Sequence, residues 1–180
     1  GLGDVYKRQM EQRINEILEF VELTDRADDK SRRYSGGMKR RLMIGMALLH
    51  KPKMLFLDEP TVGLDPQVRR KMWDLIRKMN EAGMTVLLTT HYIEEADQLC
   101  RRVAIMNRGR IIAVDTPQKL KEKVGRVVVE HMEADGMINN FFDNREQAAS
   151  YVAGLNSNAT VREANLEDVF IELTGRRVND

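Results

Sequence analysis

Two acidic residues, Asp58 and Glu59, directly follow a short apolar run at 54–57. Burying a carboxylate pair at the end of a strand is costly unless a cation, a water molecule or a hydrogen-bond donor meets it. A metal ion bound to a phosphate supplies such a partner, because the first acid can help to hold Mg²⁺ while its neighbour polarises an attacking water. A simpler interpretation also fits, in which both residues face solvent and Glu59 caps the next turn.

A second candidate is Ser35-Gly36-Gly37, which stands at the start of a helical pattern. Glycines let backbone N–H groups approach a ligand without a Cβ in the way, and a helix N-terminus favours anions. A nucleotide phosphate would suit this arrangement. An ordinary serine N-cap with two loop glycines explains the same residues without a ligand.

Two further residues could act at such a site. His91 follows two threonines at the end of the apolar run "MTVLLTT", and an imidazole there could contact a γ-phosphate or position a water. A lone histidine is more often structural. Asp65, in "GLDP", could contact a partner or order its loop, and a plain Asp-Pro turn explains it equally well.

These candidates need strands and helices to position them. Apolar periodicity predicts helices over 10–23, 37–50, 67–81 and 93–100, with strands buried on both faces in "KMLFLDEP" and "MTVLLTT". This order predicts an α/β fold, a mostly parallel sheet flanked by helices. Ligands bind at the carboxyl ends of such strands, where Asp58, Glu59 and His91 fall.

The later part of the chain predicts a hairpin in "RVAIMNRGRIIAVD", a capped helix in "TPQKLKEKVG" and then a small α+β appendage. In the appendage, "VVVE" predicts a strand, "NREQAASYVAGL" a helix and "NLEDVFIELTG" a closing helix that ends at Gly175. Residues 1–9 show no clear period and are interpreted as a fusion or assembly scar. The predicted organisation is therefore a scar at 1–9, a main domain at 10–125 and an accessory region at 126–180.

Composition narrows the class of protein. The 29 basic and 28 acidic residues give a net charge of +1, so no overall field favours nucleic acid or a membrane surface. The single cysteine, Cys100, excludes an internal disulfide and is typical of a reducing compartment. No apolar run approaches the roughly 20 residues that cross a bilayer, and the N-terminus lacks a secretory signal core, so a soluble cytoplasmic chain is expected.

Together, the motifs resemble those of the ATP-binding cassette (ABC) ATPases. "YSGGMKR" resembles the family's signature motif, usually Leu-Ser-Gly-Gly-Gln, and "MLFLDEP" resembles its Walker B strand. "GLDP" matches the D-loop, and "TTHYIEEA" resembles the switch-histidine segment. The similarity covers roughly residues 10–125, and "NLEDVFIELTG" resembles the ending of drug-efflux and antibiotic-resistance cassettes.

This resemblance implies ATP and Mg²⁺ as cofactors and a head-to-tail dimer of two ATPase protomers. The signature-type residues would contact the γ-phosphate of an ATP held by the opposite protomer; they are Ser35, Gly36, Gly37 and Met38, with Met38 in place of the usual glutamine. The remaining residues would act at the protomer's own nucleotide: Asp58 through Mg²⁺, Glu59 as base or water-orienting residue and His91 as γ-phosphate sensor. Asp65 would link the two protomers.

The resemblance further implies a transmembrane permease as partner, an export function and a position on the inner face of the cell membrane, with no nucleic acid involved. Two alternatives stay open. One is a soluble cassette protein that acts on ribosomes or DNA, and the other is a non-catalytic or regulatory module of the same fold.

One departure from the family is clear. The phosphate-cradling motif Gly-x-x-x-x-Gly-Lys-Ser/Thr is absent, and the sequence contains no Gly-Lys pair. The adenine-stacking aromatic and the glutamine loop are also missing, and in the family all three precede the first helical segment of this chain. The chain is therefore expected to be the C-terminal part of a longer cassette, a partial P-loop NTPase that alone binds ATP weakly and is inactive.

Overall fold

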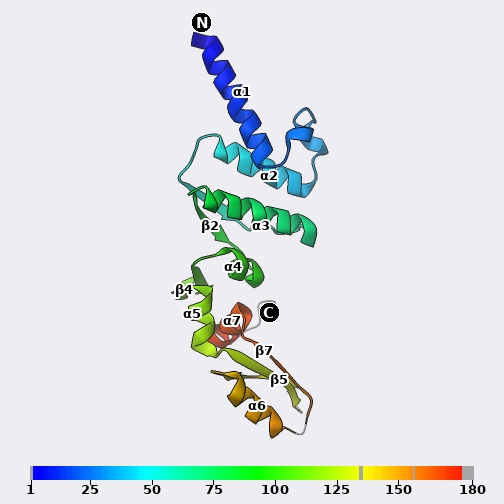
Figure 1. Ribbon diagram of the computed structural model, residues 1–180, viewed down its shortest axis with the longest axis vertical. Coiled ribbons are helices and arrows are strands. Elements are labelled where there is room, and N and C mark those ends of the chain that lie inside the picture. The colour runs from blue at the N-terminus through cyan, green and yellow to red at the C-terminus, as the bar shows by residue number, and fades with distance from the viewer. Residues whose placement is uncertain (1, 134–135, 156, 176–180) are drawn as a thin grey trace. The chain divides into compact units, whose positions relative to one another are not determined.

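The structure is a computed structural model that describes residues 2–133, 136–155 and 157–175. The chain divides into two compact units, residues 1–90 and 91–180, and each is described by itself. Figure 1 shows their helices and strands in chain order.

The first unit is a helical layer joined to a parallel pair of strands. Its elements are α1 (Leu2–Phe20), two 3-10 turns (Thr24–Arg26 and Ser31–Arg33), α2 (Gly36–Leu48), β1 (Met54–Asp58), α3 (Pro66–Glu81) and β2 (Thr85–Thr89). β1 and β2 run parallel, with α3 as the crossover between them (Figure 1). The α1 helix packs on α2, and α2 packs on α3.

The core of this unit lies between the helices. Its buried side chains are those of Ile17, Val21, Leu23, Ile44, Leu48, Met72, Leu75, Ile76 and Met79. Gly45 allows α2 to approach α1, because a Cβ at this position would lie 3.0 Å from Ile17 Cγ2. The helix predicted from Met10 is present, but it begins at Leu2 and so includes residues 2–9, in which the sequence showed no clear period.

The prediction that β1 and β2 are buried on both faces is wrong. Phe56 and Leu87 are cross-strand partners, and their side chains are 69% and 54% exposed. Met54 lies on the same face and is also exposed, whereas Leu55 on the opposite face is buried. Only one face of the strand pair is therefore covered in the described part of the chain, because α3 packs on a single side.

In its described residues, the second unit contains two antiparallel sheets and four helices. Its elements are α4 (Ile93–Leu99), β3 (Val103–Asn107), β4 (Arg110–Asp115), α5 (Pro117–Val124), β5 (Val127–Glu133), β6 (Gly136–Phe142), α6 (Arg145–Ala153), β7 (Ala159–Glu163) and α7 (Leu166–Thr174). The predicted hairpin is β3–β4, turning at Arg108 and Gly109, which both have a positive φ. The order of the second sheet is β6-β5-β7.

The described residues of this unit include two buried apolar clusters. One holds Ile105, Leu120, Leu166 and Val169, and the other holds Val127, Val129 and Ala148. The predicted caps are present: Thr116 accepts from the N–H of Lys119 at the start of α5, and Gly175 ends α7 in the left-handed conformation. The strands β6 and β7 were not predicted from the sequence.

The α/β fold class is confirmed, although the parallel part of the described sheets is limited to β1 and β2. The division into a scar, a main domain and an accessory region stays a prediction. Among the described helices, none combines the length and the apolar character that crossing a bilayer requires.

Candidate functional site

The acidic pair lies at the carboxyl end of the β1–β2 ladder, as the sequence predicts. Asp58 is the last residue of β1 and pairs in register with Thr89, the last residue of β2. The Thr89 hydroxyl donates a hydrogen bond to the Asp58 carboxylate. Asp58 is exposed at this edge, so its second oxygen can meet a cation there.

Glu59 turns the chain away from the strand. Its N–H donates to the Thr89 carbonyl at 3.0 Å, which extends the ladder by one bond, and its φ of 46° lies in the left-handed region. A non-glycine residue in this region costs roughly 1–2 kcal/mol. The side chain of Glu59 is half-buried, unlike that of Asp58. The two acids therefore have different surroundings.

Thr89 was not among the residues picked out from the sequence. It contacts both acids, through its hydroxyl to Asp58 and through its carbonyl to Glu59. The parallel register of the two strand-type runs could have revealed it, since the last residue of each run falls at the same level of the sheet.

Ser35 is the N-cap of α2. Its Oγ accepts the N–H of Met38 at 3.3 Å, as an ordinary cap does. Ser35 and Gly36 are exposed, whereas Gly37 is buried and Met38 is half-buried. Tyr34 directly precedes the cap and is itself fixed, because its side chain is buried and its hydroxyl donates to the Arg26 carbonyl at 2.6 Å. The serine N-cap is thus confirmed, but the two glycines form the first turn of α2 and are not loop residues. The serine hydroxyl keeps its own proton for a further acceptor.

Asp65 is the N-cap of α3. Its Oδ1 accepts the N–H of Val68 at 3.0 Å, and Pro66 occupies the first turn. Val68 also lies against Gly37, so the starts of α2 and α3 are neighbours in the first unit. Asp65 is exposed and has a capping role whether or not it also contacts a second protomer.

His91 belongs to the second unit, two residues beyond the end of β2. It is exposed, and its ring centroid lies 4.3 Å from that of Tyr92. The structure therefore groups Asp58 and Glu59 with Thr89, and groups Ser35–Met38 with Asp65. The position of His91 relative to them stays a prediction.

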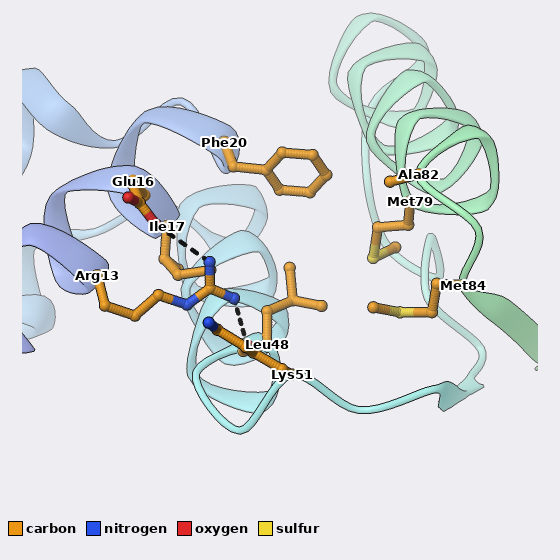
Figure 2. A pocket seen from close by; sticks show the side chains of 9 residues that line it. All are labelled: Arg13, Glu16, Ile17, Phe20, Leu48, Lys51, Met79, Ala82 and Met84. Carbon is orange, nitrogen blue, oxygen red and sulfur yellow. Dashed lines mark hydrogen bonds and ion pairs between the residues drawn. The ribbon is translucent and has the colours of Figure 1, made fainter.

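A groove between α1, α2 and α3 has a volume of about 290 Å³. At one side, the Arg13 guanidinium donates to the Leu48 carbonyl at 3.0 Å and pairs with Glu16 at 3.3 Å. Figure 2 shows the Phe20 ring pointing across the groove toward Met79 and Ala82. No residue predicted for phosphate or metal binding lines it, so the groove is a separate feature.

Comparison with known proteins agrees with the motifs. The model of the ABC transporter family matches residues 3–62. Linearmycin resistance ATP-binding protein LnrL of Bacillus subtilis (strain 168) is 37% identical over an alignment of 204 positions, which covers 96% of this chain and 66% of that protein. The chain belongs to the ABC transporter family.

A second relative of this ABC chain is Nod factor export ATP-binding protein I of Cupriavidus metallidurans, 39% identical over 96% of the chain and 64% of that protein. This chain thus spans 66% of the length of LnrL and 64% of the length of the Nod factor export protein. Among solved structures, cbiO1 from Clostridium perfringens, part of the ABC transporter complex cbiONQ, matches with a TM-score of 0.60 and 31% identity over 63% of the chain and 46% of that protein. A nucleotide-free ATP-binding cassette from an ABC transporter matches with a TM-score of 0.59 and 28% identity over 63% of the chain and 45% of that cassette.

Proposed function

We propose that this chain supplies the signature and catalytic segments of an ATP-hydrolysing ABC subunit that drives export through a transmembrane permease. The observation that carries the proposal is the acidic pair at the end of β1, where Thr89 contacts both Asp58 and Glu59. ABC membership and the export and resistance names of the relatives support it.

Asp58 is the residue to hold Mg²⁺. Its carboxylate is exposed beside a threonine hydroxyl, and oxygen donors of this kind suit the ion. The described residues contain no group of three acidic, histidine or cysteine side chains that could hold a metal. Mg²⁺ commonly uses one or two carboxylates together with phosphate oxygens and water. When bound, the ion neutralises charge that develops on the phosphate.

Glu59 orients and deprotonates the attacking water. Its backbone is fixed by the hydrogen bond to the Thr89 carbonyl, and its carboxylate is less exposed than that of Asp58. A half-buried carboxylate beside a reacting phosphate is suited to accept the proton that the water loses on attack. His91 would contact the γ-phosphate from the segment that follows β2.

The exposed start of α2 would bind the γ-phosphate of an ATP held by a second protomer. The first N–H groups of a helix have no partner inside the helix, and here they belong to Gly36 and Gly37. The Ser35 hydroxyl can donate its proton to a phosphate oxygen while it accepts from Met38. In this head-to-tail dimer Asp65 would reach across to the partner, and the subunit would lie on the inner face of the membrane against its permease.

The test uses a chimera in which this chain replaces the matching part of LnrL. The purified chimera should hydrolyse Mg-ATP, and Glu59→Gln should lower kcat by about 10²–10⁴-fold because the water loses its base. Glu81→Gln is the matched control, since this exposed glutamate lies in the same unit at the end of α3. An undiminished kcat in the Glu59→Gln chimera would refute the assigned role.

A further inference from the structure

The two glycines at the start of α2 meet different surroundings. A Cβ added at Gly36 would have no heavy atom within 4 Å. A Cβ added at Gly37 would lie 2.4 Å from Val68 Cγ1 and 3.9 Å from Leu64 Cδ2, and the first distance is too short for any real contact. Packing therefore requires a glycine at position 37 and leaves position 36 open.

Val68 takes part in both helix starts. Its N–H is the donor that Asp65 accepts at the N-terminus of α3, while its side chain lies on Gly37 in the first turn of α2. The Ser35 cap stands two residues before Gly37 and the Asp65 cap three residues before Val68. A single contact thus joins two capped helix ends that are 30 residues apart in the sequence.

Val68 can approach the α2 backbone closely because Gly37 has no side chain. A branched residue pressed against a glycine has little room to slide, since interiors are close-packed and small shifts produce clashes or gaps. The start of α2 and the loop that precedes α3 therefore keep one mutual position.

We propose that Val68 is a positioning residue. Its side chain packs on Gly37 and thereby fixes the Ser35–Met38 segment and the Asp65 loop relative to each other as one rigid block. The importance of this block for nucleotide rests on the proposed function, in which Ser35–Met38 contact a phosphate and Asp65 contacts the partner protomer. A shift of about 1 Å in such a segment can cost on the order of 10²-fold in rate.

The first experiment uses this chain without nucleotide, so that it does not depend on the proposed function. Val68→Ala should increase the hydrogen-exchange rate of the Met38 amide at least several-fold, because the start of α2 loses its support. Val152→Ala removes the same two methylene-sized groups from a half-buried helical valine in the second unit and should leave Met38 exchange unchanged. Equal Met38 exchange in the Val68→Ala and Val152→Ala chains would overturn the proposal.

A double-variant cycle supplies the second measurement. Gly37→Ala should lower the melting temperature and accelerate Met38 exchange, since its methyl collides with Val68. The double variant G37A/V68A adds one carbon on α2 and removes two from α3, which relieves the collision, and it should recover most of both losses. Losses that simply add in the double variant would contradict a direct contact. If Val68→Ala alone is too unstable to study, the double variant is compared with Gly37→Ala, and a double variant that is no more stable than Gly37→Ala would contradict the contact.

The LnrL chimera separates positioning from simple stability. Below its melting transition, Val68→Ala should lower kcat for Mg-ATP about 10-fold or more, whereas Val68→Ile, which keeps the branched Cβ and its seat on Gly37, should restore it. Full kcat in Val68→Ala would refute the positioning role. Loss of kcat in Val68→Ala with full activity in Glu59→Gln would instead refute the catalytic assignment alone.

Discussion

Thr89 donates a hydrogen bond from its hydroxyl to the carboxylate of Asp58, its cross-strand partner at the end of the β1–β2 ladder. The same threonine accepts the N–H of Glu59 through its carbonyl at 3.0 Å. Thr89 thereby orients the carboxylate of Asp58 and holds the backbone of Glu59. The orientation of the two acids therefore depends on the register of β1 against β2 as well as on the acidic residues themselves.

Replacing Thr89 by valine tests this relationship. The substitution keeps the shape and removes the hydroxyl, so Asp58 loses its orienting donor. In the LnrL chimera, the Mg²⁺ concentration for half-maximal hydrolysis should rise several-fold, while the free energy of unfolding falls by only about 1 kcal/mol at this exposed position. Thr85→Val, an exposed threonine at the start of the same strand, is the control. Identical Mg²⁺ dependence in both variants would show that Thr89 does not orient Asp58.

A second prediction concerns the chain alone. In the proposed function Ser35, Gly36 and Gly37 would donate to a γ-phosphate, but the sequence contains no Gly-Lys pair to hold the other phosphates. Isothermal titration with Mg-ATP should therefore detect only weak binding, with Kd in the millimolar range or above. Tight binding by the isolated chain would mean that another surface holds the nucleotide.

The sequence predicts the placement of the acids well, because strand ends and helix caps are local signals. Asp58 ends β1 and Ser35 caps α2, as periodicity and capping rules predict. Asp65, interpreted from the sequence as a turn residue, instead caps α3. Packing partners that are distant in the sequence could not be predicted in this way. The contact of Val68 with Gly37 joins segments 30 residues apart, and no local pattern contains this information.

The burial of the strands shows a related difficulty. A continuous apolar run predicts burial on both faces, yet Phe56 and Leu87 are exposed. An apolar sequence shows that a strand face can be buried. Whether that face is buried depends on which other elements pack against the sheet. The strands β6 and β7 were missed because their alternation includes polar residues such as Asn139, Asn140 and Arg162, which weaken the apolar signal.

Cys100 gives a prediction about pH. Burial raises the pKa of its thiol, and the charge of Glu95 raises it further. The folded state therefore keeps the neutral thiol at a pH where the unfolded chain ionises, so this contribution to stability is intact below about pH 8.5 and is lost as the pH rises through the folded pKa. Urea denaturation at pH 7.5 and 10 should show a smaller alkaline loss for Cys100→Ser than for the parent chain. Equal losses would mean that the thiol does not contribute.

The last prediction concerns the second unit, where Arg162 joins β7, β5 and α7. Its guanidinium donates to the two Asp168 oxygens at 2.7 and 2.8 Å and to Glu130 at 2.8 Å. Asp168 is 2% exposed and also accepts the N–H of Asn165 at 2.8 Å, completing the capping box of α7. The hydrogen bond to Asp168 raises the pKa of Arg162, so this cation stays charged at any practical pH.

Asp168→Asn removes the buried acid of this network, while Glu130 still pairs with Arg162. The substitution should lower the free energy of unfolding by about 1.5–3 kcal/mol, because it removes charge-assisted hydrogen bonds, as measured by urea denaturation followed by circular dichroism. Glu163→Gln breaks the ion pair with Arg145, in which both side chains are 80% exposed, and should change stability by less than about 1 kcal/mol. If the two variants lower the free energy of unfolding equally, the Arg162 network does not hold α7 on the sheet. A large loss for Asp168→Asn alone would show that this buried acid contributes to holding α7 on the β6-β5-β7 sheet.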